Sequence, residues 1–556
     1  MRKKENIIIT IVLLGLMSNA NSQSPCFPPP DAKARDWLTH ITPSGRYYFP
    51  ANYCVVSGLP DLQPTPYWRI CQGCNDPDAG YMMALYTDNN PQGSPSVNKP
   101  LVIVPGFDFS RGGPNQMTLA SLENSLRNSG FLGQLTSAGF DVFIVMFKNP
   151  HIWTQNNVQT LMQALNEVQA TSGHMSYGNE IIVLGISSGG VIARYALQEL
   201  GVRVENGGSF YPKLLVTLDS PHRGADIPIS VQNLLRYSNS KSAEAGRITN
   251  IILSSAAGQL LIKQHKGGRS GTVNHDITNY ETLINIDGTL NEHGRFMAEI
   301  NAPSYIGKLQ VFRPYAGFTT NPACQMDQAL CSVLQDPSNP NCDVDPIKCS
   351  VNSNYLNTAA ITNGQSDGLG YGYAPGQEYL GMYHPLSTRI CVGVCPFCIC
   401  RTVSVSLARL HLHTSTPSLS ARSRVFIGKY LDQDEYTYNL REPVLTENAP
   451  GSSLNYNNAG IYTLIRTLTE GITVFGTRLT WNSANLLNYQ TSSFIPTISA
   501  AGVVSSTVNI NNVAAWFISP SFITSNSLFK QIYLAPTNQS HVNINPGNVA
   551  FLLSLL

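Results

Sequence analysis

The sequence predicts an α/β fold with a doubly wound, mostly parallel sheet, and two kinds of pattern lead to this prediction. Continuous apolar runs, the composition of strands buried on both faces, lie at residues 101–104, 139–147, 181–186 and 213–218. Between them, residues 158–170 and the segment after residue 188 carry apolar side chains at helical spacing. Strands that alternate with helices in this way favour a parallel sheet with helices on both faces.

The turn after the third apolar run reads Gly185-Ile186-Ser187-Ser188-Gly189. In so tight a turn between strand and helix, the central Ser187 is forced toward positive φ, and its side chain stands clear of the sheet. The helix that follows presents the Ser188 amide and the positive end of its dipole to a charge forming beside Ser187. We therefore expect Ser187 to be a nucleophile and Ser188 to supply one oxyanion-hole amide. A plain turn between buried elements is the alternative.

The first apolar run continues into Pro105-Gly106-Phe107-Asp108. This loop lies upstream of the Ser187 turn, where a second oxyanion donor is expected. The amide of Phe107 is the candidate donor, and Gly106 lets the backbone come close to a substrate. An ordinary turn at a strand end is the alternative.

The fourth apolar run ends in Asp219-Ser220-Pro221-His222-Arg223-Gly224-Ala225. Together with the Ser187 turn, this segment resembles the α/β-hydrolase superfamily, and within it secreted bacterial lipases and esterases. The resemblance covers about residues 101–225 and resumes near the C-terminus. Pro105-Gly106 departs from the His-Gly of many relatives but keeps the glycine. The resemblance implies a hydrolase of acyl esters with a Ser-His-acid triad.

A serine hydroxyl is a poor nucleophile at neutral pH and needs an imidazole to accept its proton. In the superfamily the triad follows the chain order Ser, acid, His. His541 fits this order best, because it follows an apolar strand at 529–534 and a loop, and precedes a terminal helix at 547–556. The alternatives to His541 are His384, His411 and His413.

Two aspartates compete for the role of the acid. Asp219 ends the strand beside the nucleophile strand, and Asp367 follows the next expected strand, residues 359–362. We prefer Asp219, because a carboxylate at the end of a buried strand is costly unless it is paired. Asp367 stands before a glycine, and Asp-Gly is also a common turn without chemistry. His222 is expected to be structural, bonded to backbone near the turn.

The charge balance argues against nucleic acid and anionic lipid as partners. Charged residues make up 12% of the chain and the formal net charge is +1, about half the usual charged share. We therefore expect an uncharged small-molecule or lipid ester as the substrate. The proposed chemistry needs no metal and no cofactor. The sequence does not indicate an oligomeric state.

The first residues have the organisation of a signal peptide. Basic residues 2–4 precede an apolar core at 7–17, and small residues at Ala20 and Ser22 permit cleavage before Gln23. The apolar core is shorter than the roughly 18 residues that a membrane span needs, and the mature chain has no integral membrane segment by this criterion. The sequence thus predicts a secreted, periplasmic or cell-surface protein.

The cysteines support an oxidising compartment. The chain has 12 of them, in three even groups at 26–74, 324–349 and 391–400, so local disulfides are the simplest interpretation. Zinc at Cys71-x-x-Cys74 or Cys395-x-x-Cys398 is the alternative.

The remaining segments divide by composition. The expected units are a signal peptide 1–22, a Cys- and Pro-rich extension 23–98 laid over the core, the first part of the hydrolase core 99–225, a helical cap 226–309, a Cys-containing insertion with a core strand 310–390, a β-rich insertion 391–446, and a C-terminal core part 447–556 that carries the catalytic histidine.

The leading hypothesis is a secreted serine hydrolase that cleaves carboxylic esters, of the lipase or esterase type. Ser187 attacks the carbonyl, His541 moves the proton, Asp219 orients His541, and the Phe107 and Ser188 amides bind the oxyanion. An acyltransferase or amidase with the same triad is one alternative. A surface binding protein of the same fold without turnover is another.

We expect the exported protein to begin near Gln23 and to hold few or no free thiols, because disulfides form and persist outside the cytosol. Intact mass before and after alkylation measures both properties. Stoichiometric zinc in the purified protein would instead favour metal sites.

Overall fold

The computed structural model describes residues 97–262, 292–312 and 356–556, with gaps inside these ranges, and short strands before residue 97. Its centre is an eight-stranded sheet in the order β1-β4-β6-β5-β7-β8-β9-β19. The strands are β1 (Asp36–Ile41), β4 (Gly80–Leu85), β5 (Leu101–Val104), β6 (Val142–Phe147), β7 (Ile181–Ile186), β8 (Pro212–Leu218), β9 (Asn357–Gln365) and β19 (Gln531–Ala535).

The strands from β6 to β19 in this order run parallel to their neighbours, whereas β4 is antiparallel to both β1 and β6. The predicted α/β class with a mostly parallel sheet is confirmed. All residues of β5 and β7 are buried, as their apolar sequences require. Because the carboxyl ends of parallel strands meet at one edge, the loops after β5, β7, β8 and β19 come together there.

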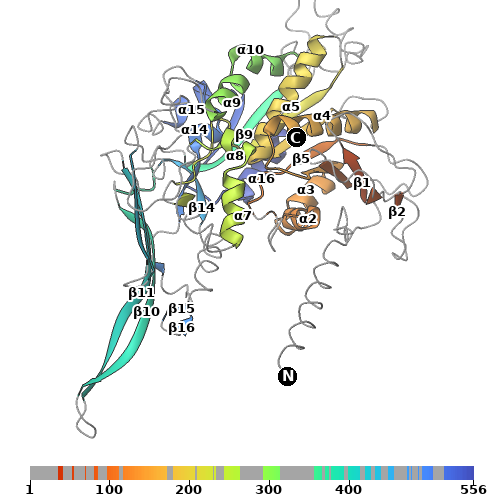
Figure 1. Ribbon diagram of the computed structural model, residues 1–556. Helices are drawn as coiled ribbons and strands as arrows, with labels where there is room; N and C mark the ends of the chain where they lie inside the picture. Colours follow the sequence, from red (N-terminus) through yellow and green to blue (C-terminus); the bar gives the residue numbers. More distant parts are fainter. Residues whose placement is uncertain are drawn as a thin grey trace, which may run out of the picture.

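Helices cover both faces of the sheet (Figure 1). On one face, α4 (Thr154–Thr171) and α5 (Ser188–Glu205) share an apolar core with the sheet. On the other, α2 (Leu119–Asn128), α3 (Phe131–Ser137) and α16 (Pro546–Leu555) form a second core. The sheet is therefore buried between two helical layers, which leaves its carboxyl edge for the loops.

The range 23–98 contributes two strands to this sheet. It was expected to lie over the core, but β1 and β4 extend the sheet itself, with Met82 opposite Val145 of β6. The short β2 (Tyr53–Cys54) and β3 (Arg69–Ile70) pair separately. The predicted signal peptide lies outside the described residues.

A second, antiparallel sheet has the order β13-β12-β11-β10-β17. Its strands are β10 (Glu378–Val392), β11 (Ile399–His413), β12 (Ser420–Ile427), β13 (Asp432–Asn439) and β17 (Leu486–Leu487). The long hairpin β10–β11 projects away from the main sheet (Figure 1), and its register places Cys391 opposite Cys400. The antiparallel strands thus begin before residue 391, the expected start of the β-rich insertion.

Short elements complete the described chain. They are α7 (Ala243–Ile252), α8 (Ser255–Leu260), α9 (Glu292–Ile300), α10 (Pro303–Ile306), the 3₁₀ helix η1 (Gly307–Gln310), β14 (Gly451–Asn455), β15 (Thr473–Val474), β16 (Thr477–Arg478), β18 (Thr491–Pro496), α14 (Thr497–Ala500) and α15 (Pro520–Asn526). No helix within the described ranges has the length and apolar character needed to cross a bilayer.

The helices between residues 243 and 310 make two kinds of contact. Helices α9 and α10 pack on α5, where Glu299 accepts a hydrogen bond from Tyr195 and Tyr305 donates one to Glu199. Helices α7 and α8 instead contact loops at the carboxyl edge of the sheet, through Arg247 of α7 and the Ala256 amide of α8. This second contact reaches the part of the fold where the expected site lies.

Among the histidines whose side chains the structure describes, His222 and His293 are fully buried. Burial lowers the pKa of His293 to about 4 and that of His222 well below its usual value. Both are therefore neutral in the folded protein at neutral pH, whereas an unfolded chain would protonate them near pH 6.5.

We expect the protein to lose stability as the pH falls from about 6.5 to 4. In that window the unfolded chain binds more protons than the folded one, so acid favours unfolding. For His293 the shift from 6.5 to about 4 corresponds to a penalty on the order of 3 kcal/mol once it is complete.

Urea unfolding at several pH values, compared with His293→Asn, measures this effect. Asparagine can keep the donor that His293 Nδ1 offers to the Gln259 carbonyl but does not titrate. A variant whose stability falls with pH as steeply as that of the wild type would contradict the assignment.

Candidate active site

Ser187 lies at the junction of β7 and α5 in a strained backbone conformation. Its φ is 54° and its ψ is −131°, a region that non-glycine residues occupy only when their surroundings enforce it. The Ser187 amide donates to the Leu218 carbonyl of β8 at 2.8 Å, and its own carbonyl accepts from the Gly190 amide. The turn is thus held from both sides, with the hydroxyl at the carboxyl edge of the sheet.

Two glycines make this geometry possible. A Cβ on Gly189 would lie 2.2 Å from the Val104 carbonyl oxygen, so a side chain there would keep α5 away from β5. A Cβ on Gly106 would lie 2.5 Å from the Cβ of Ser187. The loop after β5 therefore rests directly on Ser187.

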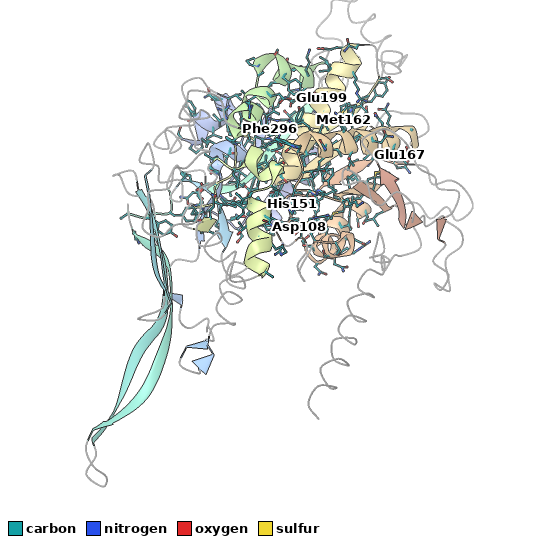
Figure 2. The ribbon with its side chains drawn as sticks, viewed as in Figure 1. Asp108, His151, Met162, Glu167, Glu199 and Phe296 are labelled. Atoms are coloured by element: carbon teal, nitrogen blue, oxygen red, sulfur yellow. The ribbon has the colours of Figure 1, made fainter. Side chains whose placement is uncertain are left out.

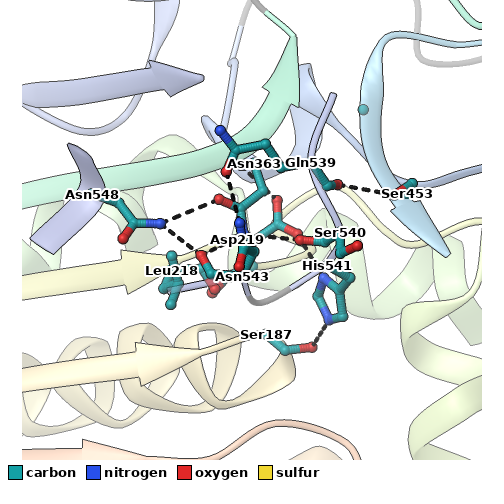
Figure 3. A network of polar contacts seen from close by, with 12 residues as sticks. Ser187, Leu218, Asp219, Asn363, Ser453, Gln539, Ser540, His541, Asn543 and Asn548 are labelled. Atoms are coloured by element: carbon teal, nitrogen blue, oxygen red, sulfur yellow. Dashed lines mark hydrogen bonds and ion pairs between the residues drawn. The ribbon is translucent and has the colours of Figure 1, made fainter. Parts of the chain in front are cut away.

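His541 connects Ser187 to Asp219 (Figure 3). Its Nε2 lies 2.8 Å from the Ser187 Oγ, and its Nδ1 lies 2.6 Å from the Oδ2 of Asp219. In this arrangement Nδ1–H donates to the carboxylate, which leaves Nε2 as the acceptor for the serine proton. The structure thus brings together the three residues that the sequence singled out as a triad.

Asp219 is completely buried at the end of β8 and has φ 48°. Its Oδ1 accepts a hydrogen bond from the backbone amide of Asn363 at 3.2 Å, while Oδ2 faces His541. Its own amide donates to the Ile361 carbonyl of β9. Both carboxylate oxygens therefore have partners, which offsets the cost of burying the charge.

Polar residues that sequence reasoning missed hold the loop of His541 (Figure 3). The side-chain amide of Asn363 donates to the carbonyls of Ser540 and Asn543, each at 3.3 Å. On the other side, the His541 amide donates to the Ser453 carbonyl of β14 at 2.9 Å. The sequence offered one signal for Asn363: it directly follows the expected strand at 359–362. A polar side chain at the end of a buried strand needs partners, which is the reasoning that favoured Asp219.

The expected oxyanion donors flank the serine. Ser188 opens α5, whose first amides have no partner inside the helix. Phe107 follows Gly106 in the loop that rests on Ser187. Both residues thus belong to the segments next to Ser187 that the sequence indicated, the start of α5 and the loop after β5.

Aromatic rings surround these groups. The ring of Phe494 meets that of His541 edge-on, with centroids 4.7 Å apart and an angle of 81°. Phe109 lies 6.1 Å from Phe494 and 4.9 Å from Phe107, between ring centroids. This row gives the site an apolar wall, which strengthens the electrostatic interactions inside it.

His151 reaches the same loop from the segment before α4. Its Nε2 donates to the Asp108 carbonyl at 2.8 Å, and its ring lies 4.6 Å from that of Phe107. Figure 2 shows His151 and Asp108 side by side. Burial lowers the pKa of His151 to about 4, with the nearby Arg111 and Arg247 adding to the shift. His151 is therefore neutral at neutral pH.

Among the other candidates, only His222 falls in the part of the chain whose side chains the structure describes. Asp367 is outside the described residues, as are the side chains of His384, His411 and His413 on β10 and β11. His222 is buried as a structural residue, but its ring bonds the Thr217 hydroxyl at 3.1 Å rather than backbone. In the described part of the chain, no three His, Cys, Asp or Glu side chains form a group that could hold a metal ion.

Topology decides the fold at this point. The loop resting on the serine follows β5, the third strand of the main sheet along the chain, and the strained serine follows β7 in a strand–turn–helix. This is the arrangement of the nucleophile elbow and its oxyanion loop. The fold is that of an α/β-hydrolase.

Three similar solved structures match only part of this chain. No family model and no curated protein matches the sequence. Among solved structures, the rice cell wall degrading esterase LipA from Xanthomonas oryzae is 16% identical, with 30% of this chain and 42% of that chain covered and a TM-score of 0.20. Esterase B from Lactobacillus rhamnosis is 12% identical, with 45% and 65% covered and a TM-score of 0.21.

A putative esterase from Staphylococcus aureus is 15% identical, with 32% of this chain and 52% of that chain covered and a TM-score of 0.20. The chain thus spans less than two thirds of the length of each of these proteins. Likenesses at this TM-score say nothing of activity, and the fold follows from the order and direction of the strands.

We expect Gly106→Ala to impair the site without unfolding the protein. The added methyl group would lie 2.5 Å from the Ser187 Cβ and 3.0 Å from its Oγ, so the serine or the loop must move. A displacement of about 1 Å in such a site costs about 10²-fold in rate.

The rate of Ser187 labelling by a fluorophosphonate measures this effect. Gly133→Ala in α3 is the matched control, because a Cβ there meets nothing within 4 Å. Equal labelling rates in both variants would contradict the close approach of Gly106.

Proposed function

We propose that the protein is a serine hydrolase that cleaves carboxylic esters through Ser187, His541 and Asp219. The observation that carries the proposal is the hydrogen-bonded chain from the Asp219 Oδ2 through His541 to the Ser187 Oγ, with distances of 2.6 and 2.8 Å. Both distances lie in the hydrogen-bonding range that a general base needs in order to accept the serine proton.

The reaction follows from these positions. His541 Nε2 takes the proton of the Ser187 hydroxyl as its oxygen attacks the ester carbonyl carbon. The carbonyl oxygen becomes an oxyanion beside the Phe107 and Ser188 amides, which donate hydrogen bonds to it. His541 then gives its proton to the departing alkoxide, and an acyl group remains on Ser187.

Water completes the cycle by the reverse sequence of proton movements. His541 removes a proton from the water that attacks the acyl carbon, and returns it to the Ser187 oxygen as the acid product leaves. Asp219 keeps its charge throughout, holds the His541 tautomer and stabilises the imidazolium. An acyltransferase would use an alcohol and an amidase would release an amine at the same site, and nothing in the described residues favours either.

The substrate is proposed to be an uncharged ester of small-molecule or lipid type. The low charge of the chain and the aromatic row beside His541 support an apolar acyl or alcohol group. We also propose that the protein is exported by its N-terminal segment, on the sequence pattern of residues 1–22.

We expect Ser187→Ala to abolish ester hydrolysis and fluorophosphonate labelling with the fold intact. The loss is expected to be about 10⁴-fold or more in kcat, because only the oxyanion hole and binding would remain. Hydrolysis of p-nitrophenyl esters of increasing length measures it, with the exposed Ser137→Ala as control. A wild type that neither hydrolyses these esters nor labels would favour a binding protein.

We expect Asp219→Asn to lower kcat by up to about 10⁴-fold with little change in KM, because the amide cannot stabilise the imidazolium. Asp367→Asn is the matched comparison and should keep substantial activity. The reverse result would assign the acid to Asp367, and circular dichroism of both variants separates chemistry from unfolding.

A further inference from the structure

The loop after β5, residues 105–109, and Arg111 next to it are held by side chains from outside. We call these residues the β5 loop. His151 Nε2 donates to the Asp108 carbonyl at 2.8 Å. Arg247 Nη1 donates to the carbonyl of Phe109 at 3.0 Å and also to that of Arg111. Three hydrogen bonds, to the carbonyls of Asp108, Phe109 and Arg111, therefore hold the backbone just beyond the Phe107 amide.

Both donors connect the β5 loop to one pair of helices. Arg247 lies on α7. His151 precedes α4, but its carbonyl accepts a hydrogen bond from the Ala256 amide of α8 at 3.2 Å. Helices α7 and α8 follow each other along the chain and pack together. The β5 loop is thus tied to the α7–α8 pair directly through Arg247, and indirectly through His151.

The two donors are suited to a fixed geometry. The Arg247 guanidinium offers N–H groups in a rigid plane, and a charged donor forms a stronger bond to a carbonyl than a neutral one. The ring of His151 also packs against Phe107, with centroids 4.6 Å apart. Its neutral state at neutral pH keeps a second positive charge away from the guanidinium of Arg247.

We propose that Arg247 and His151 are positioning residues of the oxyanion hole, through which the α7–α8 pair sets the direction of the Phe107 amide. This inference rests on the proposed function. Neither side chain touches the reacting atoms in this scheme, and both act through backbone carbonyls of the β5 loop. Displacement of α7 would turn the amide away from the oxyanion and slow the chemical step, while Ser187, His541 and Asp219 stay in place.

The experiment compares Arg247→Met with Arg247→Lys by steady-state kinetics on a p-nitrophenyl ester. An amide that is misplaced by about 1 Å should lower kcat for Arg247→Met by about 10- to 100-fold. KM should change by less than about 2-fold, because the loss occurs in the transition state. Lysine can still donate to one carbonyl and should restore part of kcat. Arg295→Met, an exposed arginine on α9, is the control.

A trifluoromethyl ketone adds to the serine oxygen, and the oxyanion of this adduct occupies the oxyanion hole. Its affinity therefore measures how well the hole stabilises an oxyanion. Its affinity should fall by the same factor as kcat/KM across these variants, a correlation that a merely structural role would not produce. His151→Phe gives an independent arm on another element, since phenylalanine keeps the ring contact but loses the donor. Its effect and that of Arg247→Met should combine less than additively, because both act through one loop.

Three results would overturn the inference. They are unchanged kcat in both Arg247→Met and His151→Phe, a rise in KM alone, or unchanged ketone affinity when kcat falls. If Arg247→Met does not fold, the His151→Phe and Arg247→Lys measurements decide the question. Failure of the proposed function is distinct, because then the wild type itself would neither hydrolyse the ester nor react with a fluorophosphonate.

Discussion

The close approach of α5 to the sheet is the constraint on which the site depends. A Cβ on Gly185 would lie 2.3 Å from the Cα of Gly190, and one on Gly189 would lie 2.2 Å from the Val104 carbonyl oxygen. Only glycine fits such contacts. Because the helix begins so near the strands, Ser187 has to adopt its positive φ, at a cost of about 1–3 kcal/mol. Burial of most of α5 in the core offsets that cost.

A buried polar network around Asn363 fixes the Asp219 and His541 side of the site. Asn363 contacts Asp219 through its amide and the His541 loop through its side chain, and Asn548 of α16 donates to its Oδ1 at 3.5 Å. Hydrogen bonds in a low-dielectric interior orient groups that would otherwise rotate. The carboxylate and the imidazole are therefore positioned by β9 and α16, which are regular elements rather than loops.

The sequence predicted those parts of the molecule that depend on local patterns. The strands at 101–104 and 181–186 are as expected, and the strained turn at Ser187 followed from a tight strand-to-helix junction. The preference for Asp219 rested on the cost of a buried charge, and its carboxylate does pair with His541. The choice of Asp219 over Asp367 as catalytic acid stays a prediction.

Other features depend on contacts that leave no local pattern. The strands β1 and β4 join the sheet through pairing with β6, and their Cys- and Pro-rich surroundings gave no sign of it. Ser453 accepts a hydrogen bond from the His541 amide, and Arg247 donates one to the Phe109 carbonyl. Because each partner offers a backbone group, any residue type could stand at the partner position. A hydrogen bond to a backbone group therefore leaves no pair of complementary side chains in the sequence.

The distance along the chain between the partners has a consequence for folding. Ser187 and His541 are 354 positions apart, and Asp219 and His541 are 322 apart. Contacts between residues so far apart are expected to form late, because the entropy of closing a long loop is lost before the contacts stabilise the chain. A chain in which β5 to β8 have already paired would still lack its imidazole until β19 docks on β9. Under the proposed function, Ser187 therefore becomes reactive only after this docking, so its labelling would report when β19 has joined the sheet.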